Sequence, residues 1–321
     1  MSDRLFELEQ LESAVAIVRK YVPPTPQREW LLLSQRVGAT AIVKHENHAP
    51  TGAFKVRGGL VYMERLKRER PQVAGVISAT TGNHGQSIAF AARAFGVRAV
   101  IYAPLGNSPE KNAAMRSLGV ELVEHGKDFD TARMRAKEVA IEQKLEFINS
   151  FGRDLVLGVA SAAYELLSAM RDLDVVYVPI GMGSCICGMI TVRDLLGLKT
   201  EIVGVQAAGA PSYYESWRQN RVVNTDAVNT KADGLATRMP DAQSVEVIRR
   251  GAVRVVIVDD AAIADAIRIY YTDTHNLIEG AGAASLAAAL GEKDQLRGKK
   301  VALMATGGNI DLALFRSWVA P

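Results

Sequence analysis

Short apolar runs alternate with segments of helical character along most of the chain. From about residue 74 onward the runs are rich in Val and Ile, which is typical of parallel strands buried on both faces. The first set of runs is VAGVISA (73–79), VRAVIYA (97–103), VELVEH (120–125) and LEFINS (145–150). Helical segments are predicted between them, near 83–95, 109–118 and 129–143.

A second set of apolar runs follows a predicted helix at 153–171. These runs are DVVYVPIG (174–181), EIVGVQ (201–206), VRVVIVD (253–259) and KKVALMAT (299–306). Strands alternating with helices favour an α/β architecture with open, mostly parallel sheets. We therefore predict two open α/β domains, the larger from residues 1–67 and 148–321 and the smaller from residues 68–147.

Composition and charge narrow the class of protein. Of the 321 residues, 48% are hydrophobic and 23% are charged, and the formal net charge of +3 is small, so a nucleic-acid groove is not expected. The polar start predicts neither a signal nor a transit peptide, and no apolar stretch has the length of a membrane span. We expect a cytoplasmic protein without a membrane or nucleic-acid partner.

The cysteines and histidines do not form a recognisable metal site. Cys185 and Cys187 are the only cysteines and lie one residue apart, where a disulfide would be strained. We interpret them as packing residues rather than nucleophiles. His45 and His48 flank a turn, and His125 and His275 have no companions at the spacing of metal ligands, so no metal is predicted.

Three loops that follow predicted strands are rich in glycine and hydroxyl groups: SATTGNHGQ (78–86), PIGMGSCICG (179–188) and ATGGN (305–309). In open α/β sheets, ligands bind beyond the carboxyl ends of the strands, where such loops meet helix N-termini. The first loop suits a carboxylate or the phenolic oxygen of a cofactor. The alternative for this loop is that Thr80 or Thr81 caps the following helix.

The glycines of GMGSCICG (181–188) predict an anion site. Glycine lets backbone amides approach an anion, and a helix N-terminus adds a favourable dipole. The phosphate-cradling nucleotide motif fails because Met189 stands where lysine is required, and the dinucleotide motif fails because Ile186 replaces a glycine. A phosphate without a nucleotide and a simple strand-to-helix turn both remain open.

Lys55 stands in an unusual setting for a lysine, between the aromatic Phe54 and apolar or small neighbours. A lysine becomes a nucleophile when its surroundings lower its pKa or when a carbonyl ligand captures it as an imine. Together with an anion cradle elsewhere in the chain, it would suit a phosphorylated carbonyl cofactor such as pyridoxal phosphate. A structural lysine on a helix surface is the alternative.

The order and spacing of several motifs resemble one family. HENHAPTGAFKVRGG, SATTGNHGQSIAFAARAFGVRAVIYAP, VPIGMGSCICG, ADG (232–234), IEGAGAASLAAAL (278–290) and ATGGN follow one another as in the threonine/serine dehydratase and serine racemase family. These are pyridoxal-phosphate enzymes of the tryptophan-synthase-β fold, also called fold type II, and the resemblance covers nearly the whole chain.

The resemblance implies roles for individual residues. Lys55 would hold the cofactor as a Schiff base, Phe54 would pack near the pyridine ring, and Asn83 would bond the phenolic oxygen. Thr306 would meet the pyridine nitrogen. The phosphate would be surrounded by Gly181, Met182, Gly183, Ser184 and Cys185. The substrate carboxylate would be held by Thr80, Thr81, Gly82, Asn83 and His84. The cofactor would lie between the two domains, in contact mainly with the larger one.

The function implied is a dehydratase, or ammonia-lyase, that converts a β-hydroxy-α-amino acid such as threonine or serine to a 2-oxo acid and ammonia. Lys55 would remove the Cα proton, and the hydroxyl would leave as water after protonation by the cofactor phosphate. The alternatives are a bulkier substrate (phenylserine, hydroxyaspartate or a hydroxyectoine-derived compound), a racemase on the same fold, and a binding protein that keeps the fold. The family also implies a homodimer.

Three positions depart from the family pattern. Met182 and Ser184 interrupt a phosphate loop that is usually almost all glycine. Thr81 stands where serine racemases place a serine that acts as acid and base on the second face, so Thr81 is a candidate catalytic residue beside Lys55. Gln206 replaces a carboxylate that helps to hold a divalent cation in metal-dependent members, so no metal dependence is expected.

Overall fold

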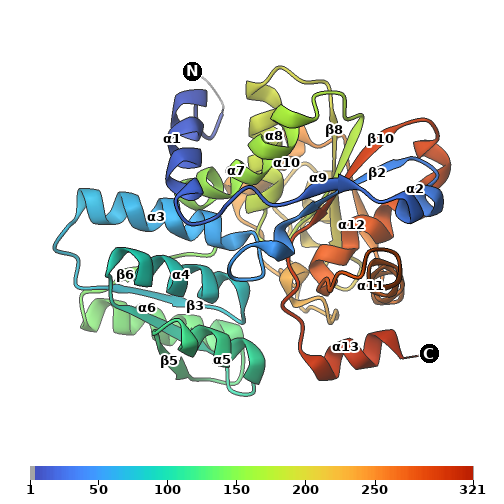
Figure 1. The fold of residues 1–321 in the computed structure, drawn as a ribbon. Coiled ribbons are helices and arrows are strands. Elements are labelled where there is room, and N and C mark those ends of the chain that lie inside the picture. Colours follow the sequence, from blue (N-terminus) through green and yellow to red (C-terminus); the bar gives the residue numbers. More distant parts are fainter. Residues whose placement is uncertain (1–3, 321) are drawn as a thin grey trace.

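The computed structural model describes residues 4–320, which form two twisted sheets with helices on their faces (Figure 1). The strands of the large sheet are β1 (Gln27–Glu29), β2 (Thr40–His45), β7 (Val175–Pro179), β8 (Glu201–Ala207), β9 (Arg254–Val258) and β10 (Lys300–Ala305). Those of the small sheet are β3 (Val76–Ala79), β4 (Ala99–Ala103), β5 (Glu121–Glu124) and β6 (Glu146–Phe147).

The large sheet has the strand order β1-β2-β10-β7-β8-β9. Only β1 pairs antiparallel; β2, β10, β7, β8 and β9 pair parallel with their neighbours. The parallel register between β10 and β2 places Ala305 opposite His45. The carboxyl ends of these two strands therefore lead together into the segments that carry Thr306 and Lys55.

The small sheet has the order β5-β4-β3-β6 and is parallel throughout. Its central strands β3 and β4 are buried along their whole length, as expected for strands covered on both faces. The buried residues Ala132, Ala136 and Val139 share an apolar cluster with Ile77 and other side chains of these strands.

The helices cover the two sheets and connect them. Those nearest the N-terminus are α1 (Leu8–Arg19), α2 (Leu31–Val37), α3 (Lys55–Glu69), α4 (Asn83–Phe95), α5 (Pro109–Ser117), α6 (Phe129–Glu142) and α7 (Arg153–Ala169). The later ones are α8 (Ser184–Leu195), α9 (Ser212–Arg218), α10 (Ala242–Gly251), α11 (Asp260–Thr274), α12 (Gly280–Gly291) and α13 (Leu312–Val319). Three 3₁₀ helices are η1 (Glu46–His48), η2 (Asp233–Leu235) and η3 (Lys293–Leu296).

One apolar cluster runs through α1, α3, α4, α7 and α8, so the two sheets share a continuous core. The backbones of α3 and α7 meet closely where two glycines face each other. A Cβ on Gly158 would lie 2.3 Å from the carbonyl oxygen of Arg57, and a Cβ on Gly58 would lie 2.7 Å from that of Leu155. This close crossing fixes the first turn of α3, which begins at Lys55.

The predicted fold class is confirmed: the chain forms two α/β units with mostly parallel sheets, and the eight strands expected from residue 73 onward are all present. Strands β1 and β2 were not predicted from the sequence. The domain boundaries stay a prediction; the one at residue 67 falls in the last turn of α3. Within residues 4–320, no helix is long and apolar enough to span a membrane.

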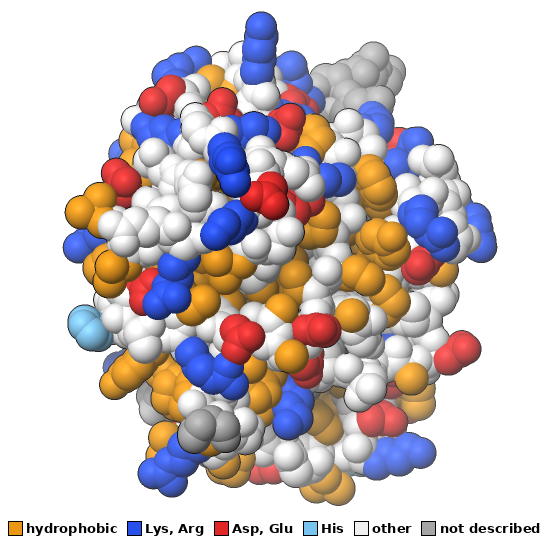
Figure 2. Space-filling view, turned by 90° about the vertical axis from the view of Figure 1, so that its right-hand side faces the viewer, with side chains coloured by type: hydrophobic (Ala, Val, Ile, Leu, Met, Phe, Trp, Pro, Cys, Tyr) orange, Lys and Arg blue, Asp and Glu red, His pale blue; other side chains and the backbone are white. Residues whose placement is uncertain are grey.

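The surface seen in Figure 2 carries basic and acidic side chains side by side. Hydrophobic side chains are most frequent near the middle of this face. Charges of both signs are thus mixed on this side of the molecule.

Candidate functional site

A cavity of about 770 Å³ lies between the ends of the two sheets. Its lining comes from the start of α3, the β3–α4 loop, the β7–α8 loop and the end of β10. All the residues predicted for the site line this one cavity: Phe54, Lys55, Thr80, Thr81, Gly82, Asn83, His84, Gly181, Met182, Gly183, Ser184, Cys185 and Thr306. The structure therefore brings together segments that are up to 252 positions apart in the sequence (306 − 54).

Lys55 is the first residue of α3, and its backbone is held from two sides. Phe54 N donates to Thr306 O (3.0 Å), and Ser87 Oγ donates to Lys55 O (2.6 Å). Lys55 is half-buried as a residue, and its amine lies 5.1 Å from the centroid of the Phe54 ring and makes no hydrogen bond or ion pair within residues 4–320. Burial lowers the pKa of Lys55, only partly offset by Cys185 and Glu279, so the neutral amine becomes more accessible.

A buried group of charges, which was not predicted from the sequence, is centred on Arg57, two residues after Lys55 in α3. Arg57 is fully buried and bonds both Glu46 (2.8 and 3.0 Å) and Glu165 (2.8 and 2.9 Å). Lys44 Nζ also donates to Glu165 (2.6 Å). The two positive and two negative charges balance, and their bonds join β2, η1 and α7 to the first turn of α3, which begins at Lys55.

The loop 80–82 leads into α4, whose first residues, Asn83 and His84, line the cavity. The first bond to the helix is made by Gln86 N to Gly82 O (3.2 Å), so the amides of residues 83–85 remain available. The alternative of a Thr cap is wrong, because the N-cap is Gly82 and no side chain caps the helix. Thr80 Oγ1 instead accepts from Gly82 N (3.0 Å), and the half-buried Thr81 hydroxyl bonds to no residue within 4–320.

Asn83 belongs to a chain of side chains beside the cavity. Its Nδ2 donates to Glu279 Oε1 (2.8 Å), and its Oδ1 accepts from Asn309 Nδ2 (2.7 Å). Asn309 also donates to Thr51 O (2.8 Å). One amide hydrogen of Asn83 remains for a ligand.

Glu279 is a residue of this chain that the sequence reasoning did not single out, although it lies in the quoted IEGAGA motif. Its carboxyl is buried, and Oε2 has no hydrogen-bond partner within the described residues. Burial, reinforced by Asp233, raises the pKa of Glu279 to about 7, against the opposing effects of Lys111, Asn83 and Lys55. Near neutral pH this group can therefore exchange a proton.

The surroundings of His84 favour its neutral form near neutral pH. Burial, followed by the charge of Lys55, lowers the pKa of His84 to about 3. Its Nε2 lies 3.1 Å from Ser78 Oγ, and that hydroxyl donates its hydrogen to Ile148 O (2.7 Å). Nε2 must therefore carry the ring hydrogen and donate to Ser78, which leaves Nδ1 as an acceptor.

The β7–α8 loop forms a compact turn at the start of α8. Gly183 has a left-handed conformation (φ 92°), and Cys187 N makes the first helical bond to Gly183 O (2.9 Å), so the amides of residues 184–186 are open. Tyr213 OH donates to Met182 O (2.9 Å), which holds the atypical methionine in the turn through its backbone. The Ser184 hydroxyl bonds to no other described residue.

Two further predicted residues complete the lining. Thr306 is buried, and its hydroxyl makes no hydrogen bond within residues 4–320, while its carbonyl accepts from Phe54 N. Cys185 and Cys187 are buried free thiols, and burial raises the pKa of Cys185 to about 12. The thiols thus stay protonated, as expected of packing residues.

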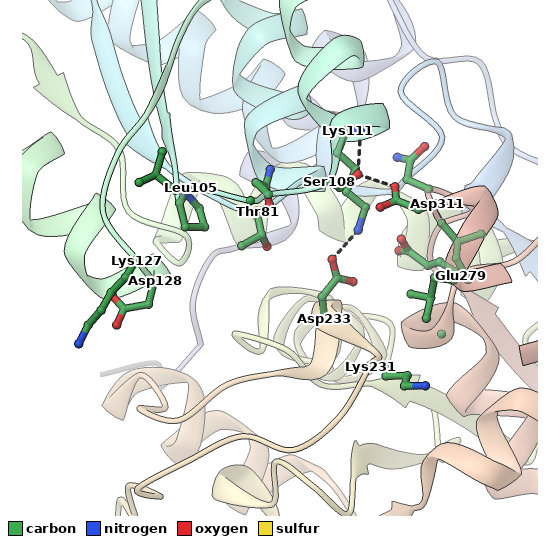
Figure 3. Close-up of a pocket in the computed structure, with 17 residues that line it drawn as sticks. Thr81, Leu105, Ser108, Lys111, Lys127, Asp128, Lys231, Asp233, Glu279 and Asp311 are labelled. Atoms are coloured by element: carbon green, nitrogen blue, oxygen red, sulfur yellow. Dashed lines mark hydrogen bonds and ion pairs between the residues drawn. The ribbon is translucent and has the colours of Figure 1, made fainter. Parts of the chain in front are cut away.

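A second cavity of about 290 Å³ adjoins the first, and Figure 3 shows its lining. Lys111 and Asp233 stand between the two cavities and form an ion pair, and Ser108 bonds Asp311 nearby. Burial alone would lower the pKa of Lys111, but Asp233 and Glu279 raise it on balance. These contacts join α5 to η2 and to the segment before α13, and so tie the small sheet to the large one.

Gln206 is committed to a structural contact. Its Oε1 accepts from Tyr213 N and Tyr214 N (both 3.0 Å) at the start of α9. The oxygen at this position is thus already bonded to two amides. Within residues 4–320, no cluster of three or more His, Cys, Asp or Glu side chains is arranged to hold a metal ion.

A half-buried lysine and an anion cradle line one cavity at the ends of two mostly parallel sheets, and together they define an enzyme site of the lysine-linked cofactor class. Residues 18–307 match the family described as pyridoxal-phosphate dependent enzyme, and the chain belongs to this family. Its cofactor is pyridoxal 5′-phosphate, and the enzyme is a lyase. Both the cofactor and the enzyme class are confirmed as the motifs predicted.

Individual relatives agree with this assignment. The chain is 37% identical over 281 residues to an L-threonine ammonia-lyase of Geobacter sulfurreducens, which covers 87% of this chain and 69% of that protein. It is 28% identical over 323 residues to a serine racemase of Schizosaccharomyces pombe, covering all of both chains. The solved structure of maize serine racemase superposes with a TM-score of 0.91 at 26% identity, covering 97% of this chain and 96% of that one.

The residues of the cavity fit the cofactor. A Cβ on Gly181 would lie 2.2 Å from Gly234 O, and one on Gly183 would lie 2.9 Å from Ser244 Cβ, so the turn packs too closely against the protein for larger side chains. The amides of residues 184–186 that follow this turn stay open and suit a phosphate. The Lys55 amine and the Thr306 hydroxyl have no competing partners in the described structure. The amine would meet the aldehyde of pyridoxal phosphate, and the hydroxyl would meet the ring nitrogen on the other side of the pyridine ring.

Proposed function

We propose that the chain is a dehydratase, or ammonia-lyase, that converts a β-hydroxy-α-amino acid, with threonine or serine as the default, to a 2-oxo acid and ammonia. One observation carries the proposal: the Lys55 amine and the open amides of α4 line the same cavity. A base and a carboxylate site are what removal of a Cα proton requires. The threonine ammonia-lyase among the relatives supports the same reaction.

In this proposal the loop at the start of α4 binds and orients the substrate. The amides of residues 83–85 and the hydroxyl of Thr81 would hold the α-carboxylate, and the positive end of the helix dipole would favour its charge. The neutral His84 adds no positive charge to the loop. The carboxylate is thereby fixed, and the Cα–H bond can be presented to Lys55.

Lys55 would act as the base. Pyridoxal phosphate, when bound, withdraws electrons from the Cα of the amino acid that is joined to it. Because its pKa is lowered, Lys55 Nζ is more readily neutral and can take up the Cα proton. The Cβ–O bond would then break, and the hydroxyl would leave as water after taking up a proton that the phosphate of the bound cofactor can supply. The enamine would tautomerise to an imine, which water hydrolyses to the 2-oxo acid and ammonia.

Three side chains would hold the cofactor rather than take part in proton transfer. Ser184 and the amides of α8 would bind the phosphate, and Asn83 would bond the phenolic oxygen with its remaining amide hydrogen. Thr306 would donate its hydroxyl to an unprotonated ring nitrogen. An unprotonated ring is a weaker electron sink, so loss of the β-hydroxyl competes well against transamination.

A racemase on the same site is the second candidate, and the uncommitted Thr81 hydroxyl favours it. A racemase needs an acid or base on each face of Cα, and Thr81 lines the cavity together with Lys55. The relative named serine racemase matches the chain over its full length. Threonine, however, is stiff about χ1, which limits how its hydroxyl can turn.

The deciding experiment measures 2-oxo acid and ammonia released from threonine, serine, phenylserine and hydroxyaspartate in both stereochemical series. Chiral chromatography of the remaining amino acid is performed in parallel. We expect 2-oxo acid to form faster than the opposite enantiomer, and Lys55→Ala to abolish it. Faster interconversion of enantiomers would establish the racemase, and neither activity would refute both. The homodimer and the cytoplasmic compartment stay predictions.

A further inference from the structure

The outer end of the main cavity is formed by residues that the reaction itself does not use. Helix α6 contributes Phe129, Asp130 and Arg133, and the loop after β6 contributes Asn149, Ser150 and Phe151. The volume of about 770 Å³ lies in the upper half of the usual range for ligand pockets, roughly 300–1,000 Å³. This volume also includes the space proposed for the cofactor, so the reach of the cavity toward the substrate side chain is shown by the residues of α6 and the loop after β6 that line it.

Arg133 is a positively charged residue in this outer part of the cavity that lacks an ion-pair partner among residues 4–320. Its side chain is half-buried and makes a single long hydrogen bond, from Nη2 to Asn149 Oδ1 (3.5 Å). It forms no ion pair with any residue in 4–320. Two other cations that line the cavity are paired, Lys111 with Asp233 and Arg238 with Asp130.

The carboxylates around the outer cavity leave the charge of Arg133 uncompensated. Asp128 caps α6 by accepting from Thr131 N (2.8 Å) and Oγ1 (2.7 Å). Asp130 is paired with Arg238. Asp226 also lines the cavity, but it is exposed to solvent. A guanidinium with free donors beside a substrate cavity is suited to a planar anion, which it binds with two parallel hydrogen bonds.

We propose that Arg133, assisted by Asn149, binds a second carboxylate at the far end of the substrate, so that the preferred substrate is a dicarboxylic β-hydroxy-α-amino acid. This inference rests on the proposed dehydratase function and specifies its substrate class. Arg133 is then a specificity-determining residue: it touches the substrate side chain but takes no part in proton transfer. Asn149 contributes an amide that orients the carboxylate.

The test compares kcat/KM for threonine with kcat/KM for β-hydroxyaspartate, in which a carboxylate replaces the methyl group, and for β-hydroxyglutamate, in which it lies one methylene further out. We expect at least one dicarboxylic substrate to exceed threonine. Arg133→Gln should reduce that dicarboxylate-to-threonine ratio by about 10- to 100-fold, the range for a hydrogen bond to a charged group. Arg135→Gln is the matched control, because Arg135 lies on the same helix and pairs with Glu138 and Glu142.

A second measurement does not depend on turnover. L-Malate and L-lactate differ by one carboxylate. We expect L-malate to raise the Tm of the holoenzyme more than L-lactate does. This difference in Tm should be lost in Arg133→Gln and kept in Arg135→Gln. If Arg133→Gln turns over threonine and keeps the wild-type ratio of dicarboxylate to threonine kcat/KM, Arg133 is only a solvated surface arginine. Equal effects of both arginine variants would also overturn the inference. Absence of 2-oxo acid from every substrate would instead refute the proposed function.

Discussion

Replacing Arg57 by Leu should destabilise the protein far more than an ordinary loss of a salt bridge. The wild-type group is neutral, because Arg57 and Lys44 balance Glu46 and Glu165, and all four side chains are at most 4% exposed. Without the guanidinium, two buried carboxylates share one lysine, and Glu46 keeps only the contacts with Thr25 (2.6 Å) and, at 3.9 Å, Lys44. Removing one partner of a buried pair costs about 3–5 kcal/mol.

The magnitude can be converted into a melting temperature. An unfolding entropy of about 2.1 cal/mol/K per residue gives about 0.67 kcal/mol/K for 321 residues, so Tm should fall by about 4–7 °C. The assay is urea and thermal unfolding followed by circular dichroism. The control is Arg65→Leu, on the same helix, where the arginine side chain is 42% exposed and pairs with Glu69 and Asp154. That change should cost at most about 1 kcal/mol.

Two results would refute this reasoning. If Arg57→Leu costs no more than Arg65→Leu, the buried charges do not support α3 as we argue. If the double variant Arg57→Leu, Glu46→Leu is as unstable as Arg57→Leu alone, the loss does not come from the uncompensated carboxylate. We expect the double variant to recover part of the stability, because it restores a neutral set of side chains.

Four further predictions concern the site. Borohydride should attach the cofactor to the peptide that contains Lys55, and Lys55→Ala should abolish the linkage and turnover while leaving the far-ultraviolet spectrum intact; label on another lysine would contradict the assignment. EDTA should change the activity little, because Gln206 Oε1 is occupied by two amides; a large loss that magnesium reverses would show a metal dependence. Thr81→Ala should keep elimination with almost no change in Tm, since no cap is lost; a selective loss of racemisation would favour the racemase. The pKa of Glu279 is about 7 in the folded protein and 4.5 ordinarily, so folding takes up a proton between pH 4.5 and pH 7. The free energy of unfolding should therefore fall by up to about 3 kcal/mol as pH rises through this range. Glu279→Gln should flatten this pH dependence, and an unchanged pH dependence of that variant in urea titrations would contradict the prediction.

The strands from residue 73 onward could be predicted because their Val- and Ile-rich runs are buried on both faces. Strand β2 was missed because its sequence ends in Lys44 and His45, both fully buried. A lysine is tolerated there because Glu165, 121 positions away, provides its partner. Local pattern carries no information on a contact at that separation, so this strand is visible only in three dimensions.

The candidate site also contains residues that could be predicted from local motifs and residues that could not. Lys55, Asn83 and the glycines at 181 and 183 stand in motifs and could be proposed from the sequence. Glu279 gains its significance from Asn83, 196 positions away, and from burial that no motif reports. The Thr80 and Thr81 cap was wrong because a hydroxyl before a helix is not enough: the chain places Gly82 at the cap and turns Thr80 toward the Gly82 amide.

The residues that hold the first turn of α3 in place differ from those that set the pKa of Lys55. Arg57 and its partners hold the first turn of α3, yet their balanced charges are not among the causes of the lowered pKa of Lys55. Burial lowers that pKa, and Cys185 and Glu279 oppose it. Support and proton affinity can thus vary independently: Arg57→Leu should impair stability and the position of the amine, whereas Glu279→Gln, by removing a negative charge, should lower the pKa of Lys55 further without weakening the hold on α3.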